Sequence, residues 1–244
     1  FMTEQFVRKM KEGVKPLGIQ LSEKQLEQFY DYFQFLVEKN KVMNLTGITE
    51  YEEVIQKHFL DSLSLIRVIP DLAEQDLKII DLGTGAGFPG LPLKIAFPNL
   101  EITLMDSLNK RINFLNEVIE SLGLQKVTAV HGRAEEMARK TEYRENFDLC
   151  VSRAVANLAS LSEYCLPFVT QGGSFISYKS GEIEEELSQS KKAIFVLGGK
   201  IESVKKFRLV ETDAERSFVQ IKKVKKTPKT YPRKAGTPSK NPIQ

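Results

Sequence analysis

The sequence has no tryptophan, and its two cysteines and two histidines are too few for most metal or disulfide chemistry. Cys150 and Cys165 stand in apolar surroundings and form no C-x-x-C pair, so we expect buried, reduced thiols. Neither histidine has a cysteine at ligand spacing, which predicts that no metal is bound. We expect His131 to be an ordinary hydrogen-bonded side chain.

Long apolar runs are also missing. A membrane-spanning helix needs about 18 consecutive apolar residues, and the sequence has neither such a run nor a signal-peptide pattern. With the reduced cysteines, this predicts a cytoplasmic protein, and we expect a monomer. The 244 residues, 41% hydrophobic and 27% charged, suit one compact catalytic domain with a smaller addition.

Acidic residues are absent from the end of the chain. From residue 222 onward there are eight basic residues: Lys222, Lys223, Lys225, Lys226, Lys229, Arg233, Lys234 and Lys240. The remainder carries 27 basic against 32 acidic residues. A basic terminus on a mildly acidic body predicts binding of a polyanion. We treat 226–244 as a tail, and its four prolines predict no regular structure.

The first part of the chain reads as helical. Apolar residues recur at helical spacing over 22–39, where Ser22 and Gln25 form a capping box, and again over 58–69. No repeat or strand pattern occurs here, so we expect a helical cap over 1–70.

Two polar features of this cap need separate interpretation. His58 and Asp61 stand three residues apart on the second helical stretch, with Ser62 beside them. A structural cluster that joins cap to core is slightly favoured over contact with RNA. We expect Asn44 to cap a helix or form a turn.

From residue 77 onward, apolar strands alternate with helices. Strands are predicted at 77–82, 101–105, 126–131, 147–152 and 174–178, and helices at 90–97, 108–122, 134–140 and 156–168. This alternation predicts a parallel sheet covered on both faces. Two further strands, 200–209 and 217–224, predict a closing antiparallel hairpin, and we place the whole α/β domain at 71–225.

The stretch DLGTGAGFPG, residues 81–90, follows the first strand and can be read in two ways. Counted from Gly85 it is the G-x-G-x-x-G of dinucleotide folds, and counted from Asp81 it is D-x-G-x-G-x-G. Glycines here let a ligand approach the backbone at a helix N-terminus. Asp106 ends the second strand, where its carboxylate can accept hydrogen bonds from ribose hydroxyls. That feature suits NAD and S-adenosylmethionine equally.

Three features favour S-adenosylmethionine. Asp81 would repel a pyrophosphate but suits ammonium and sulfonium charges. Ala134 and Glu135 follow the third strand, where a polar edge can meet adenine. The closing hairpin resembles the seven-stranded, mostly parallel sheet of class I (Rossmann-like) methyltransferases, and D-x-G-x-G-x-G resembles their first motif. We therefore expect methyl transfer rather than hydride transfer.

Segments along nearly the whole chain carry a more specific resemblance. They are NLTGI at 44–48, HFLDSL at 58–63, DLGTGAGFPGLPLKI at 81–95, DSLNKRINFL at 106–115, GRAEE at 132–136, VSRAVA at 151–156 and TPKTYPRKAGTPSKNPI in the tail. With them the chain resembles the RsmG family, also called the glucose-inhibited division protein B family. These are bacterial methyltransferases of guanine N7 in 16S ribosomal RNA. The resemblance implies 16S ribosomal RNA or the small ribosomal subunit as partner.

The resemblance also implies a set of cofactor contacts: Asp81, Gly83, Gly85, Phe88, Asp106, Ser107, Ala134, Glu135 and Arg153. Asp106 and Ser107 would hold the ribose, while Ala134 and Glu135 would frame the adenine. Arg153 lies beyond the fourth strand, at the end where open α/β sheets bind ligands, and would close the pocket near the methyl donor or the substrate. Core packing is the alternative for Phe88.

The segment after the fourth strand lacks the catalytic motifs of other methylases, and methylation of guanine N7 does not need them. N7 carries an in-plane lone pair and no proton, so its methylation needs alignment of donor and acceptor and no general base. The sequence there is SRAVAN, without the Asn-Pro-Pro-Tyr-like motif of amine methylases or a cysteine nucleophile. Arg153, Lys179 and the pair Lys110-Arg111 would hold phosphates and orient the base, although that pair can also be a solvated helical turn.

Three other functions remain open. A methyltransferase for a small molecule or a protein would leave the basic tail unexplained. A non-enzymatic RNA-binding module would not bind S-adenosylmethionine, and an NAD enzyme is the least favoured. If the tail is an RNA-binding arm, its removal should weaken RNA binding and leave cofactor affinity almost unchanged.

Overall fold

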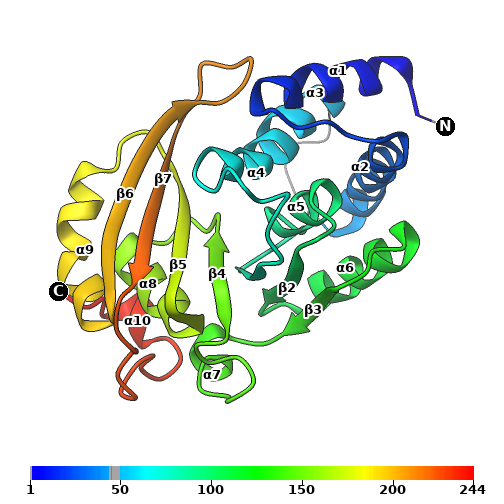
Figure 1. The fold of residues 1–244 in the computed structure, drawn as a ribbon. Coiled ribbons are helices and arrows are strands. Elements are labelled where there is room, and N and C mark those ends of the chain that lie inside the picture. Colours follow the sequence, from blue (N-terminus) through cyan, green and yellow to red (C-terminus); the bar gives the residue numbers. More distant parts are fainter. Residues whose placement is uncertain (1, 44, 46–49) are drawn as a thin grey trace.

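The protein is described here by a computed structural model that covers residues 2–43, 45 and 50–244 (Figure 1). Its centre is a seven-stranded sheet in the order β3-β2-β1-β4-β5-β7-β6. The strands are β1 Lys78–Leu82, β2 Glu101–Asp106, β3 Val127–His131, β4 Phe147–Ser152, β5 Val169–Ser180, β6 Gly199–Arg208 and β7 Glu215–Lys223. β1 to β5 are parallel, and β7 runs antiparallel between β5 and β6. The predicted fold class is confirmed.

Helices cover both faces of the sheet, because its central strands are apolar on both sides. The helices that follow the strands are α5 Gly90–Ala96, α6 Asn109–Leu122, α7 Ala134–Met137, α8 Leu158–Cys165 and α9 Glu184–Val196. Side chains of α5 and α6 belong to one buried apolar cluster, and those of α8 and α9 belong to a second. Each predicted helix is present, although α7 and α8 each end three residues early.

The N-terminal helices pack on the α5–α6 face. They are α1 Glu4–Val14, α2 Glu23–Met43, α3 Tyr51–Val54 and α4 Asp61–Leu63, with a π-helical segment Ile55–Leu60 and 3-10 turns Lys15–Leu17 and Ser64–Arg67. The predicted capping box is formed, because Ser22 and Gln25 exchange backbone-to-side-chain hydrogen bonds of 2.8 and 3.1 Å. Asn44 lies outside the described residues. The cap shares one apolar cluster with the sheet, and a domain boundary at residue 70 remains a prediction.

The tail folds back against the body beside α7 and α8 (Figure 1). It contains a short helix, α10 Thr237–Lys240, so the prediction of no regular structure was wrong for these residues. Gly236 precedes the helix with φ +88°, and Pro238 stands in its first turn. Proline is tolerated there because the first backbone N–H groups of a helix need no intrahelical acceptor.

Candidate cofactor and substrate site

A cavity of about 370 Å³ opens at the carboxyl ends of β1, β2 and β4. This is the point where the strand order reverses, the usual ligand site of open α/β sheets. Five predicted cofactor residues line the cavity: Gly83, Asp106, Ser107, Ala134 and Glu135. Arg111 also lines it, with a guanidinium nitrogen 3.5 Å from the Asp106 carboxylate. The structure therefore brings most of the predicted contacts to one place.

The glycine turn leaves open space toward a ligand. Gly83 and Gly85 have φ of +70° and +59°, and a Cβ added to either would meet none of the described atoms within 4 Å. Their conformation therefore excludes most side chains even though room is available. The Gly85 N–H donates to Asp106 Oδ2 at 2.8 Å, and Leu108 N–H donates to Oδ1 at 3.0 Å. These bonds fix the carboxylate and leave lone pairs on both oxygens.

Asp81 lies fully buried beneath this turn and does not line the cavity. Its Oδ2 accepts hydrogen bonds from the Thr84 hydroxyl at 2.7 Å and from Gly90 N–H at 2.8 Å. Its Oδ1 has no hydrogen-bond partner among the described residues. Burial raises the pKa of Asp81 to about 7, although both hydrogen bonds oppose the rise. Asp81 thus shapes the turn, and direct contact with a cofactor stays a prediction.

Phe88 faces the cap rather than the cavity. Its ring stacks on His58 with centroids 4.4 Å apart and also lies 5.6 Å from the ring of Tyr32. The structure thus favours the core alternative for Phe88 over packing against a cofactor. The Tyr32 hydroxyl donates to the carbonyl oxygen of Ala86 at 2.5 Å, so the cap holds the glycine turn directly. Sequence reasoning missed Tyr32, because no local pattern distinguishes it from the other aromatic residues of α2.

Arg153 joins the cap to the end of β4. Its guanidinium lies 3.5 Å from Asp61 Oδ2 and 3.3 Å from His58 Nδ1, and 5.3 Å from the centre of the Phe88 ring. Arg216 donates to Asp61 Oδ1 at 3.1 Å. These contacts join the cap to the sheet, as the structural interpretation of the His58–Asp61 cluster predicts, and contact of the cluster with RNA stays a prediction. Burial and the nearby Arg153 charge lower the pKa of His58 to about 3, so its ring is neutral.

A second cavity, of about 400 Å³, adjoins the first at Ala154, a residue that lines both cavities. Arg153, Lys179 and Arg216 line it together with Asp61 and Glu186. Lys179 donates to the carbonyl oxygen of Ala156 at 2.6 Å and lies 2.6 Å from Glu186. The two cavities are therefore neighbours, and the second is rich in cations.

The sequence profile of a family described as rRNA small subunit methyltransferase G matches residues 25–218. The chain belongs to this family. It is 59% identical over 232 residues to ribosomal RNA small subunit methyltransferase G of Lachnoclostridium phytofermentans, covering 95% of each chain. It is 51% identical over 232 residues to the protein of that name from Acetivibrio thermocellus, covering 95% of this chain and 94% of the other. The predicted family is confirmed.

Solved structures share the fold of this family member at low identity. A branched-chain polyamine synthase from Thermus thermophilus aligns with TM-score 0.54 and 11% identity, covering 69% of this chain and 57% of the other. A transferase from Pyrococcus horikoshii aligns with TM-score 0.51 and 13% identity, covering 66% and 62%. At such identities the likeness shows the fold alone.

The basic residues of this methyltransferase family member divide into buried and exposed ones. Lys223 is fully buried, with Nζ donating to the carbonyl oxygens of Leu166 and Val169 and lying 3.0 Å from Glu145. Its predicted contact with RNA is therefore wrong. Burial lowers the pKa of Lys223 to about 8. Arg233 also points inward, to Glu163.

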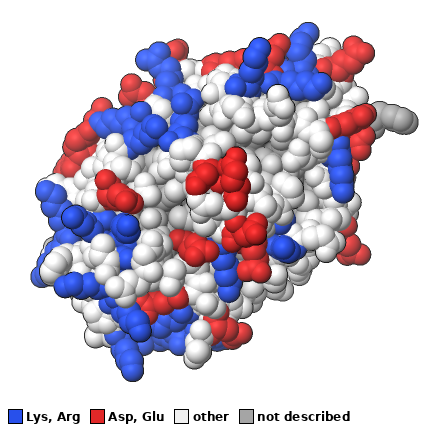
Figure 2. All heavy atoms as spheres, in the orientation of Figure 1, with Lys and Arg blue, Asp and Glu red and all other residues white. Residues whose placement is uncertain are grey.

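Apart from Arg111, which lies in the first cavity beside Asp106, the other basic residues predicted to bind RNA have exposed side chains. They are Lys110, Lys222, Lys225, Lys226, Lys229, Lys234 and Lys240. Figure 2 shows Lys and Arg gathered over the side of the molecule where α9, β6 and the tail lie. His131 is hydrogen-bonded as expected, with Nε2 3.1 Å from the Ser107 carbonyl oxygen, and both cysteines are free and buried.

Among residues 2–43, 45 and 50–244, no three His, Cys, Asp or Glu side chains cluster as metal ligands. Within the same ranges, no helix has the length and apolarity to cross a membrane.

Proposed function

We propose that this protein transfers a methyl group from S-adenosylmethionine to N7 of a guanine in 16S ribosomal RNA. Family membership makes it a small-subunit ribosomal RNA methyltransferase by descent. The observation that carries the proposal is the pair of neighbouring cavities, one built around the glycine turn and Asp106, the other lined by three basic side chains together with Asp61 and Glu186. Residues 71–225 would carry the transfer, flanked by the cap and the tail.

The residues of the first cavity fit S-adenosylmethionine. Ligand cavities measure roughly 300 to 1,000 Å³, a range that includes this one. Asp106 has free lone pairs for ribose hydroxyls. Glu135 and Ala134 line the part of the cavity where an adenine would lie. Asp81 lies outside the lining of this cavity, so pairing of its Oδ1, which has no partner among the described residues, with a cationic group of the cofactor would require that buried oxygen to become accessible. The bound cofactor supplies an electrophilic methyl group on its sulfonium sulfur.

The second cavity fits the acceptor base. Guanine presents N7 and O6 on one edge, and Arg153, Lys179 and Arg216 offer donors to O6 or to phosphates, while the N7 lone pair has to stay free to attack the methyl group. Arg153 is already fixed by Asp61 and His58, so it can orient the base without reorganising. No proton leaves N7 on attack. His58 need not act as a base, and Arg153 already occupies its Nδ1.

The exposed lysines of the tail, with Lys110, would contact RNA phosphates outside the two cavities. Such contacts position the RNA and carry no sequence information. The choice of guanine would therefore rest on the second cavity.

Labelled S-adenosylmethionine, incubated with separated RNA species, tests the proposal. We expect label in 16S ribosomal RNA, and cleavage at a single guanine after borohydride and aniline, because N7 methylation weakens the glycosidic bond. Arg153→Ala should lower the yield of the cut, whereas Arg8→Ala, on an exposed pair in the cap, should not. Label that enters the RNA but resists this cleavage would place the methyl group on an amine, a carbon or a ribose hydroxyl instead.

A further inference from the structure

We infer that residues 227–241, hereafter the clamp, position two walls of the cofactor cavity, and that Arg233 is a positioning residue for cofactor binding. The inference rests on the proposed function, because it takes the first cavity as the site of S-adenosylmethionine. It reverses the expectation that the tail affects RNA alone.

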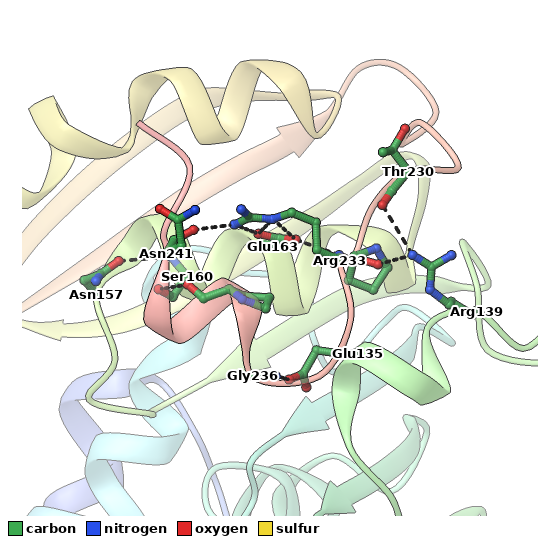
Figure 3. A network of polar contacts seen from close by, with 11 residues as sticks. Glu135, Arg139, Asn157, Ser160, Glu163, Thr230, Arg233, Gly236 and Asn241 are labelled. Carbon is green, nitrogen blue, oxygen red and sulfur yellow. Dashed lines mark hydrogen bonds and ion pairs between the residues drawn. The ribbon is translucent and has the colours of Figure 1, made fainter.

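The first anchor of the clamp is an ion pair with α8 (Figure 3). Glu163 is fully buried, and it accepts hydrogen bonds from the Arg233 backbone N–H at 2.8 Å, from Nη2 at 2.7 Å and from Nε at 3.1 Å. Arg233 Nη2 also donates to the carbonyl oxygen of Asn241, which ties the clamp to itself. A buried carboxylate depends on such partners, since its charge has lost its water.

The same helix forms a wall of the cavity. Leu161 and Tyr164 of α8 line the cavity, and Glu163 stands between them in the chain. The Ser160 hydroxyl donates to the carbonyl oxygen of Pro238 at 2.8 Å, which gives α8 a second link to the clamp. The clamp therefore holds this helix next to the cavity at two points.

The second anchor is a cavity-lining residue itself. Glu135 Oε2 accepts a hydrogen bond of 2.9 Å from the Gly236 backbone N–H, and Figure 3 shows the two groups facing each other. Gly236 has φ +88°, a backbone conformation that residues other than glycine rarely adopt. The clamp thus orients the carboxylate expected at the adenine end of the cavity.

Two arginines of the α/β domain hold the clamp by hydrogen bonds to its backbone carbonyl groups. Arg139 donates to the carbonyl oxygens of Lys229, Thr230 and Pro232, and Arg144 donates to those of Thr227, Pro228 and Tyr231. Because these bonds use carbonyl groups, the lysine side chains of the clamp are left to solvent. Arg233 and Lys234 are consequently a matched pair, adjacent in sequence and pointing to different environments.

The test compares Arg233→Ala with Lys234→Ala in the full-length protein. Calorimetry measures the Kd for S-adenosylmethionine well below the Tm, and filter binding measures RNA affinity against salt. We expect Arg233→Ala to weaken cofactor binding about tenfold, because small misplacement of supporting groups is costly, with an unchanged salt slope for RNA. Lys234→Ala should leave the cofactor Kd unchanged and reduce the salt slope by about one. Arg233→Lys keeps the positive charge but lacks the planar guanidinium group that donates from two nitrogens, so this variant should bind the cofactor more tightly than Arg233→Ala and less tightly than the wild type.

Three results would refute either this inference or the proposed function. A folded Arg233→Ala protein with the wild-type cofactor Kd would overturn the inference and leave the clamp a purely structural element. If Arg233→Ala does not fold, Gly236→Ala, which strains one backbone position, replaces it, and an unchanged Kd then overturns the inference. A wild-type protein that does not bind S-adenosylmethionine would instead refute the proposed function.

Discussion

Replacement of Asp81 by asparagine should change how stability depends on pH. The pKa of Asp81 is raised from 3.8 to about 7, because the carboxyl group is completely buried. Between these two values the folded protein keeps a proton that the unfolded chain has released. The stabilisation that this retained proton contributes should therefore be fully present below pH 3.8, and it should be lost as pH rises to about 7. At roughly 1.4 kcal/mol per pKa unit, the loss amounts to about 4 kcal/mol.

Urea unfolding of the ligand-free protein, followed by circular dichroism between pH 4 and pH 8, measures this loss. Asp81→Asn cannot ionise, and its amide oxygen can still accept from Thr84 and Gly90. The free energy of unfolding of the wild type, minus that of the variant, should fall by about 3 kcal/mol from pH 4 to pH 7 and level off toward pH 8. Parallel profiles for the two proteins would refute the reasoning and show that Asp81 is ionised throughout.

The same protonation should govern cofactor binding. A cationic group that pairs with Oδ1 requires Asp81 to be ionised, so binding near neutral pH should release a proton. Calorimetry in buffers of different ionisation enthalpy counts that proton. Affinity should rise with pH through about 7 in the wild type and not in Asp81→Asn. An equal rise in both proteins would assign the titration to another group.

Three further predictions concern groups around the site. Tyr32→Phe removes the bond to the glycine turn and leaves a buried carbonyl oxygen unpaired, so the free energy of unfolding should fall by about 1 to 3 kcal/mol in urea titrations. His58, with a pKa of about 3, should show no titration of its ring signals by NMR from pH 8 to pH 5, and its contribution to stability should be lost only as pH falls below its unfolded value of 6.5. Lys223→Ala should destabilise the protein by about 3 kcal/mol, because it removes a buried cation that pairs with Glu145 and donates to two carbonyl groups, and it should not change the salt dependence of RNA binding. Lys222→Ala should reduce that salt dependence and leave the free energy of unfolding almost unchanged.

The sheet could be predicted from sequence because its signals are local. Apolar runs, a glycine turn and strand–helix alternation need no knowledge of distant partners, and six of the seven strands begin and end within two residues of their predicted limits. β5 is the exception: it starts at Val169, which pairs with Phe147 of β4, and the register then shifts before Ser174, so residues 170–173 continue the strand as an irregular stretch despite a sequence typical of a loop. Polar, glycine-rich composition indicates exposure there, and exposure does not prevent an extended backbone.

The environment of individual charges could not be predicted. Lys222 and Lys223 are identical in type and adjacent, yet one is exposed and the other is buried against Glu145, because successive side chains of a strand point to opposite faces. The inward direction of Arg233 depends on Glu163, 70 residues away in the chain. A single acidic residue in the apolar stretch of α8 was the available signal, and it became interpretable only once a basic partner was placed beside it.

The position of the clamp has a consequence for when the enzyme acquires activity. Proteins are synthesised from the N-terminus, and their domains begin to fold in that order. The sheet, the glycine turn and Asp106 can therefore form while the segment that orients Glu135 and α8 has not yet been translated. If the clamp is needed for cofactor binding, a nascent chain is inactive toward the ribosome that is making it.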